Sequence, residues 1–318
     1  MKIVLMEPLR VSKEKIKELS QPLRDAGHEF VYYDEKTTDP DELRKRAEGA
    51  EIIMIANNPL PGEVLKDLPD AKLVNVAFTG FDHVGMDVAK EKGIKVCNAS
   101  GYATTAVAEL AVGLALGLYR KLSENEKAVH QGEAFEAPLQ GPEIHGKTVG
   151  IVGTGTIGLA TARLFKAFGV KLLGYNRSEK DEAKDLGMTY VDLDTLLMES
   201  DIVSLHLPMT EETKHLIDAA GLKKMKKSAI LLNLARGGVV DNDALAKALN
   251  EEEIAGAGID VFDMEPPLPN DYPLLEAKNT LLTPHIGFLT DEAMQMRAEI
   301  AFQNTEAFID GKPENLVN

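Results

Sequence analysis

Three side chains in the last third of the sequence could together transfer a proton and bind an anion. Arg236 follows the run Leu-Leu-Asn-Leu-Ala, Glu265 stands in Asp-Met-Glu-Pro-Pro, and His285 stands in Thr-Pro-His-Ile-Gly. A histidine can act as base and acid near neutral pH, and a neighbouring carboxylate favours its charged form. An arginine can bind a carboxylate through two parallel hydrogen bonds. Such a set suits oxidation of a 2-hydroxy acid, in which the hydroxyl loses a proton and C2 loses a hydride.

Each residue also has a simple structural explanation. Arg236 could form a surface ion pair, Glu265 could be a solvated loop charge, and His285 could cap a helix. Their positions favour chemistry, because each follows an apolar run that is typical of a strand. In open parallel sheets, ligands bind beyond the carboxyl ends of the strands.

A glycine-rich stretch predicts a dinucleotide site beside them. The apolar run 149–152 ends in Gly153-Thr-Gly155-Thr-Ile-Gly158, and an amphipathic segment follows over 159–168. This order predicts strand, tight turn and helix, in which Gly153 permits the turn, Gly155 admits a pyrophosphate and Gly158 allows close packing. The N–H groups of the new helix would face the phosphates. A glycine turn can also be purely structural, but this context favours a cofactor.

The elements that position these residues alternate between strands and helices, which predicts parallel sheets with helices on both faces. Before residue 100 we expect strands at 2–6, 29–33, 52–56, 72–78 and 94–97, with helices at 12–26, 39–47, 61–67 and 85–92. After the glycine turn we expect strands at 148–152, 171–175, 202–205, 229–233, 256–260 and 280–282, and a final helix at 291–309.

Between these two series lies a segment of different character. Residues 103–122 predict one long helix that is apolar on more than one face. We expect its own domain and a second subunit to bury these faces. Residues 131–145 have little periodicity and two prolines, and we expect a loop there.

Composition bounds the kind of protein. A chain of 318 residues suggests two domains. The net charge of −16 repels nucleic acid and anionic membranes, and no 18-residue apolar span is visible. A single cysteine, Cys97, excludes internal disulfides and a cysteine-based zinc site. We therefore expect a cytoplasmic protein with no metal, no membrane contact and no nucleic-acid partner.

As a set, five motifs resemble those of the D-isomer-specific 2-hydroxyacid dehydrogenases, over almost the full chain. They lie at 146–158, 204–208, 233–238, 260–267 and 283–287. The resemblance implies an oxidoreductase that transfers hydride between NAD(P)H and a small 2-oxo acid, acting as a glyoxylate- or hydroxypyruvate-like reductase. In that scheme Arg236 binds and polarises the substrate, His285 transfers the proton and Glu265 is its partner.

The resemblance also implies the architecture. It predicts an α/β fold of two doubly wound parallel-sheet domains. Residues 100–287 would form a Rossmann cofactor domain, and residues 1–99 with 288–318 a smaller flavodoxin-like substrate domain. A hinge and a cleft would lie between the two domains. The region 103–122 would form the interface of a homodimer.

The implied binding residues fall into two groups. The cofactor group comprises Thr104, Gly153, Gly155, Thr156, Ile157, Gly158, Asn176, Arg177, Ser178, His206, Leu207, Pro208, Thr213, Leu234, Ala235, Arg236, Asp260, His285 and Gly287. The substrate group comprises Asn57, Thr79, Gly80 and Arg236. Simple loop roles stay open for Asn57, Thr79 and Gly80, and His83 nearby is expected to be structural.

The sequence departs from the NAD-preferring pattern at one point. Asn176 stands where those enzymes carry an acid for the ribose hydroxyls, and Arg177 and Ser178 follow it. An acid would repel a 2′-phosphate, whereas arginine and serine could bind one, so NADP is favoured over NAD. Arg177 could instead stack on the adenine, in which case the protein would use both NAD and NADP.

A competing reading is a nucleotide-sensing, non-catalytic adaptor like the corepressors that share this fold. Such a protein would not need Arg236, Glu265 and His285 together, so their joint presence favours an enzyme. Which 2-oxo acid it reduces stays open, because such choices depend on one or two methylenes of pocket space.

Overall fold

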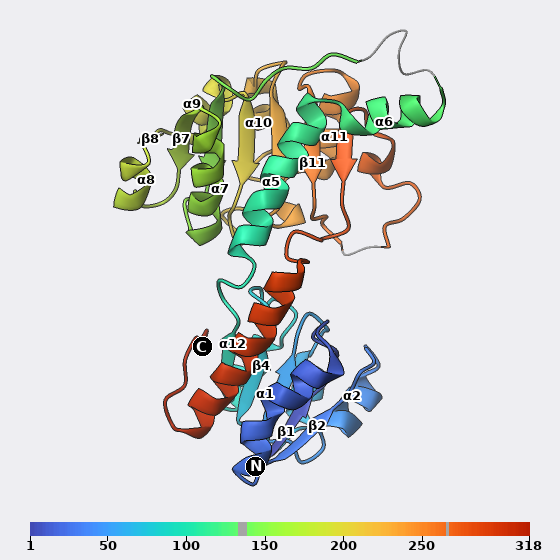
Figure 1. Cartoon of the computed structure of the whole chain (residues 1–318), viewed down its shortest axis with the longest axis vertical. Helices are drawn as coiled ribbons and strands as arrows, with labels where there is room; N and C mark the ends of the chain where they lie inside the picture. Colours follow the sequence, from blue (N-terminus) through green and yellow to red (C-terminus); the bar gives the residue numbers. More distant parts are fainter. Residues whose placement is uncertain (133–138, 265–266) are drawn as a thin grey trace. The chain divides into compact units, whose positions relative to one another are not determined.

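The computed structural model describes residues 1–132, 139–264 and 267–318 (Figure 1). The chain divides into two compact units. Unit 1 combines Met1–Ala103 with Phe288–Asn318, and unit 2 is Thr104–Gly287. Each unit has its own parallel sheet and its own core. The predicted fold class, two doubly wound α/β domains, is confirmed.

Unit 1 contains five parallel strands in the order β2-β1-β3-β4-β5, which is the flavodoxin-like order. The strands are β1 Lys2–Leu5, β2 Glu29–Tyr32, β3 Ile52–Ile55, β4 Leu73–Val76 and β5 Lys95–Asn98. The helices are α1 Lys13–Asp25, α2 Pro40–Ala47, α3 Gly62–Lys66, α4 Met86–Glu91 and α12 Asp291–Ile309. Every one matches a predicted element to within about two residues at either end.

Side chains set where the first helices begin. The Ser12 hydroxyl accepts from the N–H of Lys15 at 3.1 Å, and Asp39 accepts from the N–H of Asp41 at 2.8 Å. Helix α12, near the C-terminus of the chain, packs beside α1 and β4 of the N-terminal segment (Figure 1). Its Phe302 ring lies 5.5 Å from the Phe30 ring. The last helix therefore completes the core of unit 1.

Unit 2 contains seven parallel strands in the order β12-β11-β10-β9-β6-β7-β8. The strands are β6 Thr148–Val152, β7 Lys171–Tyr175, β8 Met188–Tyr190, β9 Ile202–Leu205, β10 Ile230–Asn233, β11 Gly256–Ile259 and β12 Thr280–Leu282. The α-helices are α5 Thr104–Tyr119, α6 Leu122–His130, α7 Thr156–Ala167, α8 Asp181–Asp185, α9 Leu193–Glu199, α10 Ala219–Lys224 and α11 Asn242–Asn250. Short 3-10 helices cover Gly237–Val239 and Pro273–Glu276.

The strand order of unit 2 reverses at β6, which pairs with β7 on one side and with β9 on the other. This is the Rossmann arrangement, and its switch point is where such sheets bind ligands. The predicted glycine turn follows β6 directly. The fold therefore places the turn at the switch point of the sheet.

One local prediction for unit 2 was wrong, and one strand was missed. The single helix expected over 103–122 ends at Tyr119, and α6 begins at Leu122 after Lys121 adopts a φ of 48°. The Asn125 amide stabilises this break by donating to the carbonyl of Lys121 at 3.1 Å. Strand β8 was not predicted, because it is three residues long with only Met188 buried.

The loop expected over 131–145 lies partly outside the described residues, at 133–138. In the described part of the chain, none of the helices combines the length and the apolar character needed to cross a membrane.

Candidate active site

The glycine turn after β6 has the geometry of a dinucleotide turn. Gly153 has a φ of 96°, and its N–H donates to the carbonyl of Tyr175 at 2.8 Å. A Cβ at Gly153 would stand 2.5 Å from the His206 carbonyl oxygen, and one at Gly158 would overlap the Gly153 carbonyl oxygen. A Cβ at Gly155 would meet nothing within 4 Å. Gly153 and Gly158 are thus required by packing, whereas Gly155 faces open space.

Helix α7 begins at this turn with its first N–H groups uncapped. Gly155 is the N-cap residue, and no side chain hydrogen-bonds the first turn. Thr156 is exposed and Ile157 is half-buried. The uncapped N–H groups and the open space above Gly155 fit a bound pyrophosphate.

The loop after β7 carries the residues predicted to read the adenosine ribose. The Asn176 amide donates to the Ser178 carbonyl at 2.8 Å, which closes a tight turn. Arg177 and Ser178 are exposed at its tip. Because Gly153 bonds to Tyr175, this turn starts directly beside the glycine turn.

His206 follows β9, on the other side of β6. Its Nε2 lies 2.8 Å from the Ser204 hydroxyl, while its Nδ1 is buried without a partner among the described residues. Burial lowers the pKa of His206 to about 4, so the ring is neutral at neutral pH. The next turn is closed by Thr213, whose hydroxyl donates to the Pro208 carbonyl at 2.7 Å. Leu207 packs against the glycine turn.

Arg236 stands at the end of β10, after the buried residues Leu234 and Ala235. The Asn233 amide donates to the Arg236 carbonyl at 3.1 Å. The next residue, Gly237, lies directly against the backbone of Phe262, so that no Cβ would fit there. The loop that carries Arg236 therefore packs against the loop that follows β11.

Asp260, at the end of β11, holds the loop that carries His285. Its Oδ1 accepts from the Thr283 hydroxyl at 2.6 Å and from the Ile286 N–H at 2.8 Å, and its Oδ2 accepts from the Gly287 N–H at 2.8 Å. Asp260 is 1% exposed. Burial raises the pKa of the Asp260 carboxyl, although these hydrogen bonds and nearby His285 oppose the shift. Both carboxylate oxygens bond groups inside unit 2, so Asp260 positions the loop that carries His285.

His285 itself has a backbone φ of 54°, which is uncommon outside glycine. Its N–H donates to the Asp260 carbonyl at 2.9 Å. The sheet places β11 between β10 and β12, so Arg236 and His285 follow the two neighbours of one strand. Glu265, the third predicted catalytic residue, lies outside the described residues.

The substrate residues predicted in unit 1 lie in the loops after β3 and β4. The Asn98 amide donates to the Thr79 carbonyl at 2.7 Å and so helps to hold the loop after β4. Within the described residues, the N–H groups of Thr79 and Gly80 make no hydrogen bond. Both N–H groups are therefore available to donate to a carboxylate. His83 lies with Nε2 2.9 Å from the Ala56 carbonyl, a structural contact.

Glu7 organises the loop that carries Asn57. Its fully buried carboxylate accepts from the N–H groups of Ala56 at 2.8 Å and Asn58 at 2.9 Å. Lys36 lies 3.4 Å from Glu7 and donates to the Asn57 side-chain oxygen at 2.9 Å. Sequence reasoning missed Glu7, because a charged residue after an apolar run looks like an ordinary strand end.

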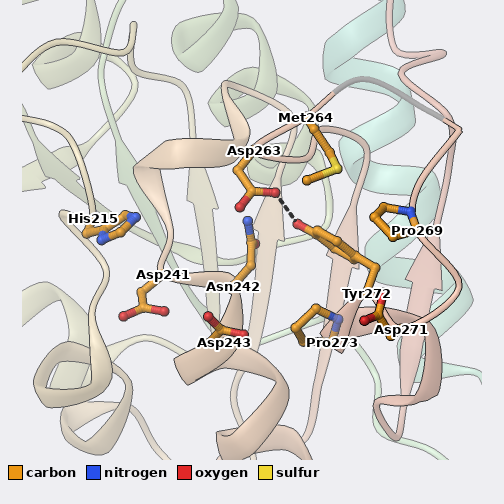
Figure 2. A pocket seen from close by; sticks show the side chains of 10 residues that line it. All are labelled: His215, Asp241, Asn242, Asp243, Asp263, Met264, Pro269, Asp271, Tyr272 and Pro273. Carbon is orange, nitrogen blue, oxygen red and sulfur yellow. Dashed lines mark hydrogen bonds between the residues drawn. The ribbon is translucent and has the colours of Figure 1, made fainter.

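A separate pocket of about 320 Å³ lies between the start of α11 and the loop after β11. Figure 2 shows its lining, in which the Tyr272 hydroxyl donates to Asp263 at 2.6 Å. Three further aspartates line it, at positions 241, 243 and 271. This lining would repel the carboxylate of a 2-oxo acid and the phosphates of a cofactor. The pocket is therefore distinct from the predicted site.

In the parts of the chain that the structure describes, no group of three or more His, Cys, Asp or Glu is arranged to hold a metal ion. Cys97 is buried in unit 1, and burial raises the pKa of its thiol to about 12. The thiol is therefore protonated and unreactive.

Comparisons with known proteins agree with this architecture. Residues 112–287 match the family described as D-isomer specific 2-hydroxyacid dehydrogenase, NAD binding domain. A glyoxylate reductase of Thermofilum pendens is 43% identical over 87% of this chain and 83% of that protein. A glycerate dehydrogenase of Methylorubrum extorquens is 42% identical over 91% of this chain and 92% of that protein.

A solved D-lactate dehydrogenase of Aquifex aeolicus, complexed with NAD and lactic acid, superposes with a TM-score of 0.85 at 32% identity, covering 99% of this chain and 98% of that one. The family match includes the glycine turn and the loops of Arg236 and His285. The chain therefore belongs to the D-isomer-specific 2-hydroxyacid dehydrogenases, as an oxidoreductase that transfers hydride between a nicotinamide cofactor and a 2-hydroxy or 2-oxo acid.

Proposed function

We propose that the protein is an NADPH-dependent reductase of glyoxylate or hydroxypyruvate. The observation that carries the proposal is the placement of Arg236 and His285 after the two neighbours of β11, with the His285 loop held by Asp260. Relatives named glyoxylate reductase and glycerate dehydrogenase support substrates of this size.

The proposed roles follow from the chemistry of each side chain. Arg236 binds the substrate carboxylate and polarises the carbonyl oxygen. His285 donates a proton to that oxygen, and Glu265 favours the charged imidazole. A bound reduced nicotinamide would supply the hydride. Asp260 positions the His285 loop without touching the substrate.

We also propose substrate contacts for the loops that follow β3 and β4 in unit 1. The N–H groups of Thr79 and Gly80 bind the substrate carboxylate, and the Asn57 amide contacts its remaining polar group. Lys36 holds the Asn57 oxygen at 2.9 Å, so the Asn57 amide N–H₂ is left to donate.

The NADP preference rests on the loop after β7. The Asn176 amide donates to the Ser178 carbonyl, and Arg177 and Ser178 are exposed at the tip of the loop. A guanidinium and a hydroxyl there suit a 2′-phosphate, and position 176, where NAD-preferring enzymes carry an acid for the ribose hydroxyls, holds Asn176. The glycine turn and the uncapped start of α7 would hold the pyrophosphate.

We further propose a cytoplasmic homodimer with no nucleic-acid partner. Helix α5 carries Thr105, Glu109 and Gly113 exposed along one side at a spacing of four residues. Such a line suits close packing against a second copy of the helix. The net charge of −16 disfavours nucleic acid.

The test is cofactor oxidation with NADPH and NADH in parallel, across glyoxylate, hydroxypyruvate, pyruvate and phenylpyruvate. We expect the highest kcat/KM with NADPH and one of the first two acids. A clear preference for phenylpyruvate would contradict the substrate class, and equal kcat/KM for both cofactors would end the NADP preference. Tight cofactor binding without any turnover would instead favour the adaptor, which the enzyme names of the relatives do not support.

A further inference from the structure

The hydroxyl of Tyr190 joins two loops of unit 2 that are distant in sequence. Tyr190 is the last residue of β8. Its hydroxyl lies 2.7 Å from the Thr154 hydroxyl and accepts from the Lys180 N–H at 3.0 Å. Thr154 belongs to the glycine turn, and Lys180 ends the loop between β7 and α8 (Figure 1).

These two loops are already joined at their base by the bond from the Gly153 N–H to the Tyr175 carbonyl. Tyr190 adds a second link at the far end of the loop 176–180. Thr154 is fully buried, so this link is shielded from water at one end. The Tyr190 ring also packs against Gly174, where a Cβ would stand 3.3 Å from its Cε1. The ring therefore contacts β7 just before the loop 176–180, and the hydroxyl binds the far end of that loop.

The remaining bonds of the loop are local. Asn176 bonds to Ser178, and Glu179 pairs with Lys184, a pair in which both side chains are about half exposed. An exposed ion pair contributes little to holding a loop. The placement of Arg177 and Ser178 relative to the glycine turn thus depends on Tyr190.

We propose that Tyr190 is a positioning residue for cofactor selectivity: its hydroxyl holds the 2′-phosphate loop in register with the pyrophosphate turn. This inference rests on the proposed NADP preference. A single nucleotide must reach both loops at once, so a loop that shifts relative to the turn cannot bind a 2′-phosphate at full strength. A nucleotide without that phosphate uses only the turn and is indifferent to the shift.

The test compares two nucleotide probes on the full chain by calorimetry. Adenosine 2′,5′-bisphosphate carries the 2′-phosphate and 5′-AMP lacks it. In Tyr190→Phe, we expect binding of the bisphosphate to weaken by about 5–10-fold, the effect of one or two lost hydrogen bonds. Binding of 5′-AMP should change by less than about twofold.

Two further variants separate positioning from general damage. The quantity compared is the affinity for adenosine 2′,5′-bisphosphate divided by the affinity for 5′-AMP. Tyr119→Phe removes a tyrosine hydroxyl elsewhere in unit 2, which donates to the Asp201 carbonyl at 3.2 Å. This variant should leave the affinity ratio unchanged. Thr154→Val should lower the ratio as Tyr190→Phe does, and Thr154→Ser, which restores a hydroxyl, should recover it. The Thr154 pair also serves if Tyr190→Phe does not fold.

The outcomes are distinct. A wild-type ratio in both Tyr190→Phe and Thr154→Val would overturn the role of Tyr190 while leaving the NADP preference intact. Equal binding of the two probes by the wild-type chain would overturn the preference itself, and the role of Tyr190 with it. A lowered ratio that Thr154→Ser recovers would support both.

Discussion

His285 combines a reactive side chain with an uncommon backbone conformation. Its φ of 54° is held by bonds from its loop to Asp260. Asparagine tolerates this conformation, so His285→Asn should fold normally. Because a general acid contributes about 10²–10⁴-fold, we expect kcat to fall by at least about 100-fold while the Kd for NADPH stays unchanged. Steady-state kinetics and calorimetry would measure both.

His215 offers a matched control for this substitution. It is an exposed histidine of the same unit with a φ of 49°. His215→Asn makes the same chemical change outside the predicted site and should keep both kcat and Kd. If His285→Asn also kept its kcat with chemistry rate-limiting, the proton-transfer role would be refuted.

His206 predicts a pH dependence of stability. Burial lowers its pKa to about 4, whereas an unfolded histidine titrates near 6.5. Between these values the unfolded chain binds a proton that the native chain does not, so His206 makes stability fall as pH falls through this window. At pH 5.5 the loss should be about 1 kcal/mol relative to pH 7.5.

The variant His206→Gln lacks this titration. Calorimetric unfolding of both proteins at pH 7.5 and pH 5.5 should show the stability advantage of the wild type shrinking at the lower pH. An advantage that is the same at both values would show that His206 is not buried in its neutral form.

At the scale of an element, the turn between β6 and α7 separates stability from binding. A methyl at Gly158 would overlap the Gly153 carbonyl, so Gly158→Ala should destabilise the fold by about 1–3 kcal/mol. A methyl at Gly155 would meet nothing within 4 Å, so Gly155→Ala should keep its Tm. It should nevertheless weaken cofactor binding about tenfold or more, because the methyl occupies the place of the pyrophosphate.

Thermal unfolding and cofactor titration of the two variants check this contrast. The reverse pattern, with Gly155→Ala unstable and cofactor affinity unchanged, would mean that the glycine turn has only a packing role.

At the scale of the whole molecule, the proposed dimer depends on the exposed side of α5. A Cβ at Gly113 would meet nothing within 4 Å inside the chain, and arginine favours helix more than glycine does. Gly113→Arg should therefore leave the subunit folded but place a large charge in the interface. Sedimentation should show a dimer for the wild type and for Gly113→Ala, and a monomer for Gly113→Arg. A dimer in all three would place the interface elsewhere.

Much of the architecture could be predicted from local patterns. Short, mostly apolar segments mark most of the described strands, and capping residues such as Ser12 and Asp39 mark helix starts. These signals work because each is set by residues within one turn or one strand. They fail where a short segment depends on its neighbours, as at β8 and at the break between α5 and α6.

The sequence by itself determined the fold class, the glycine turn and the residues whose chemistry suits a 2-oxo acid. Only the tertiary structure decided how those residues are held. Asp260 binds backbone groups 26 and 27 residues away, and Tyr190 reaches Thr154 across 36 residues. Such partners are brought together by the order of strands in the sheet. A linear pattern contains no record of that proximity, because each residue looks locally like an ordinary strand end.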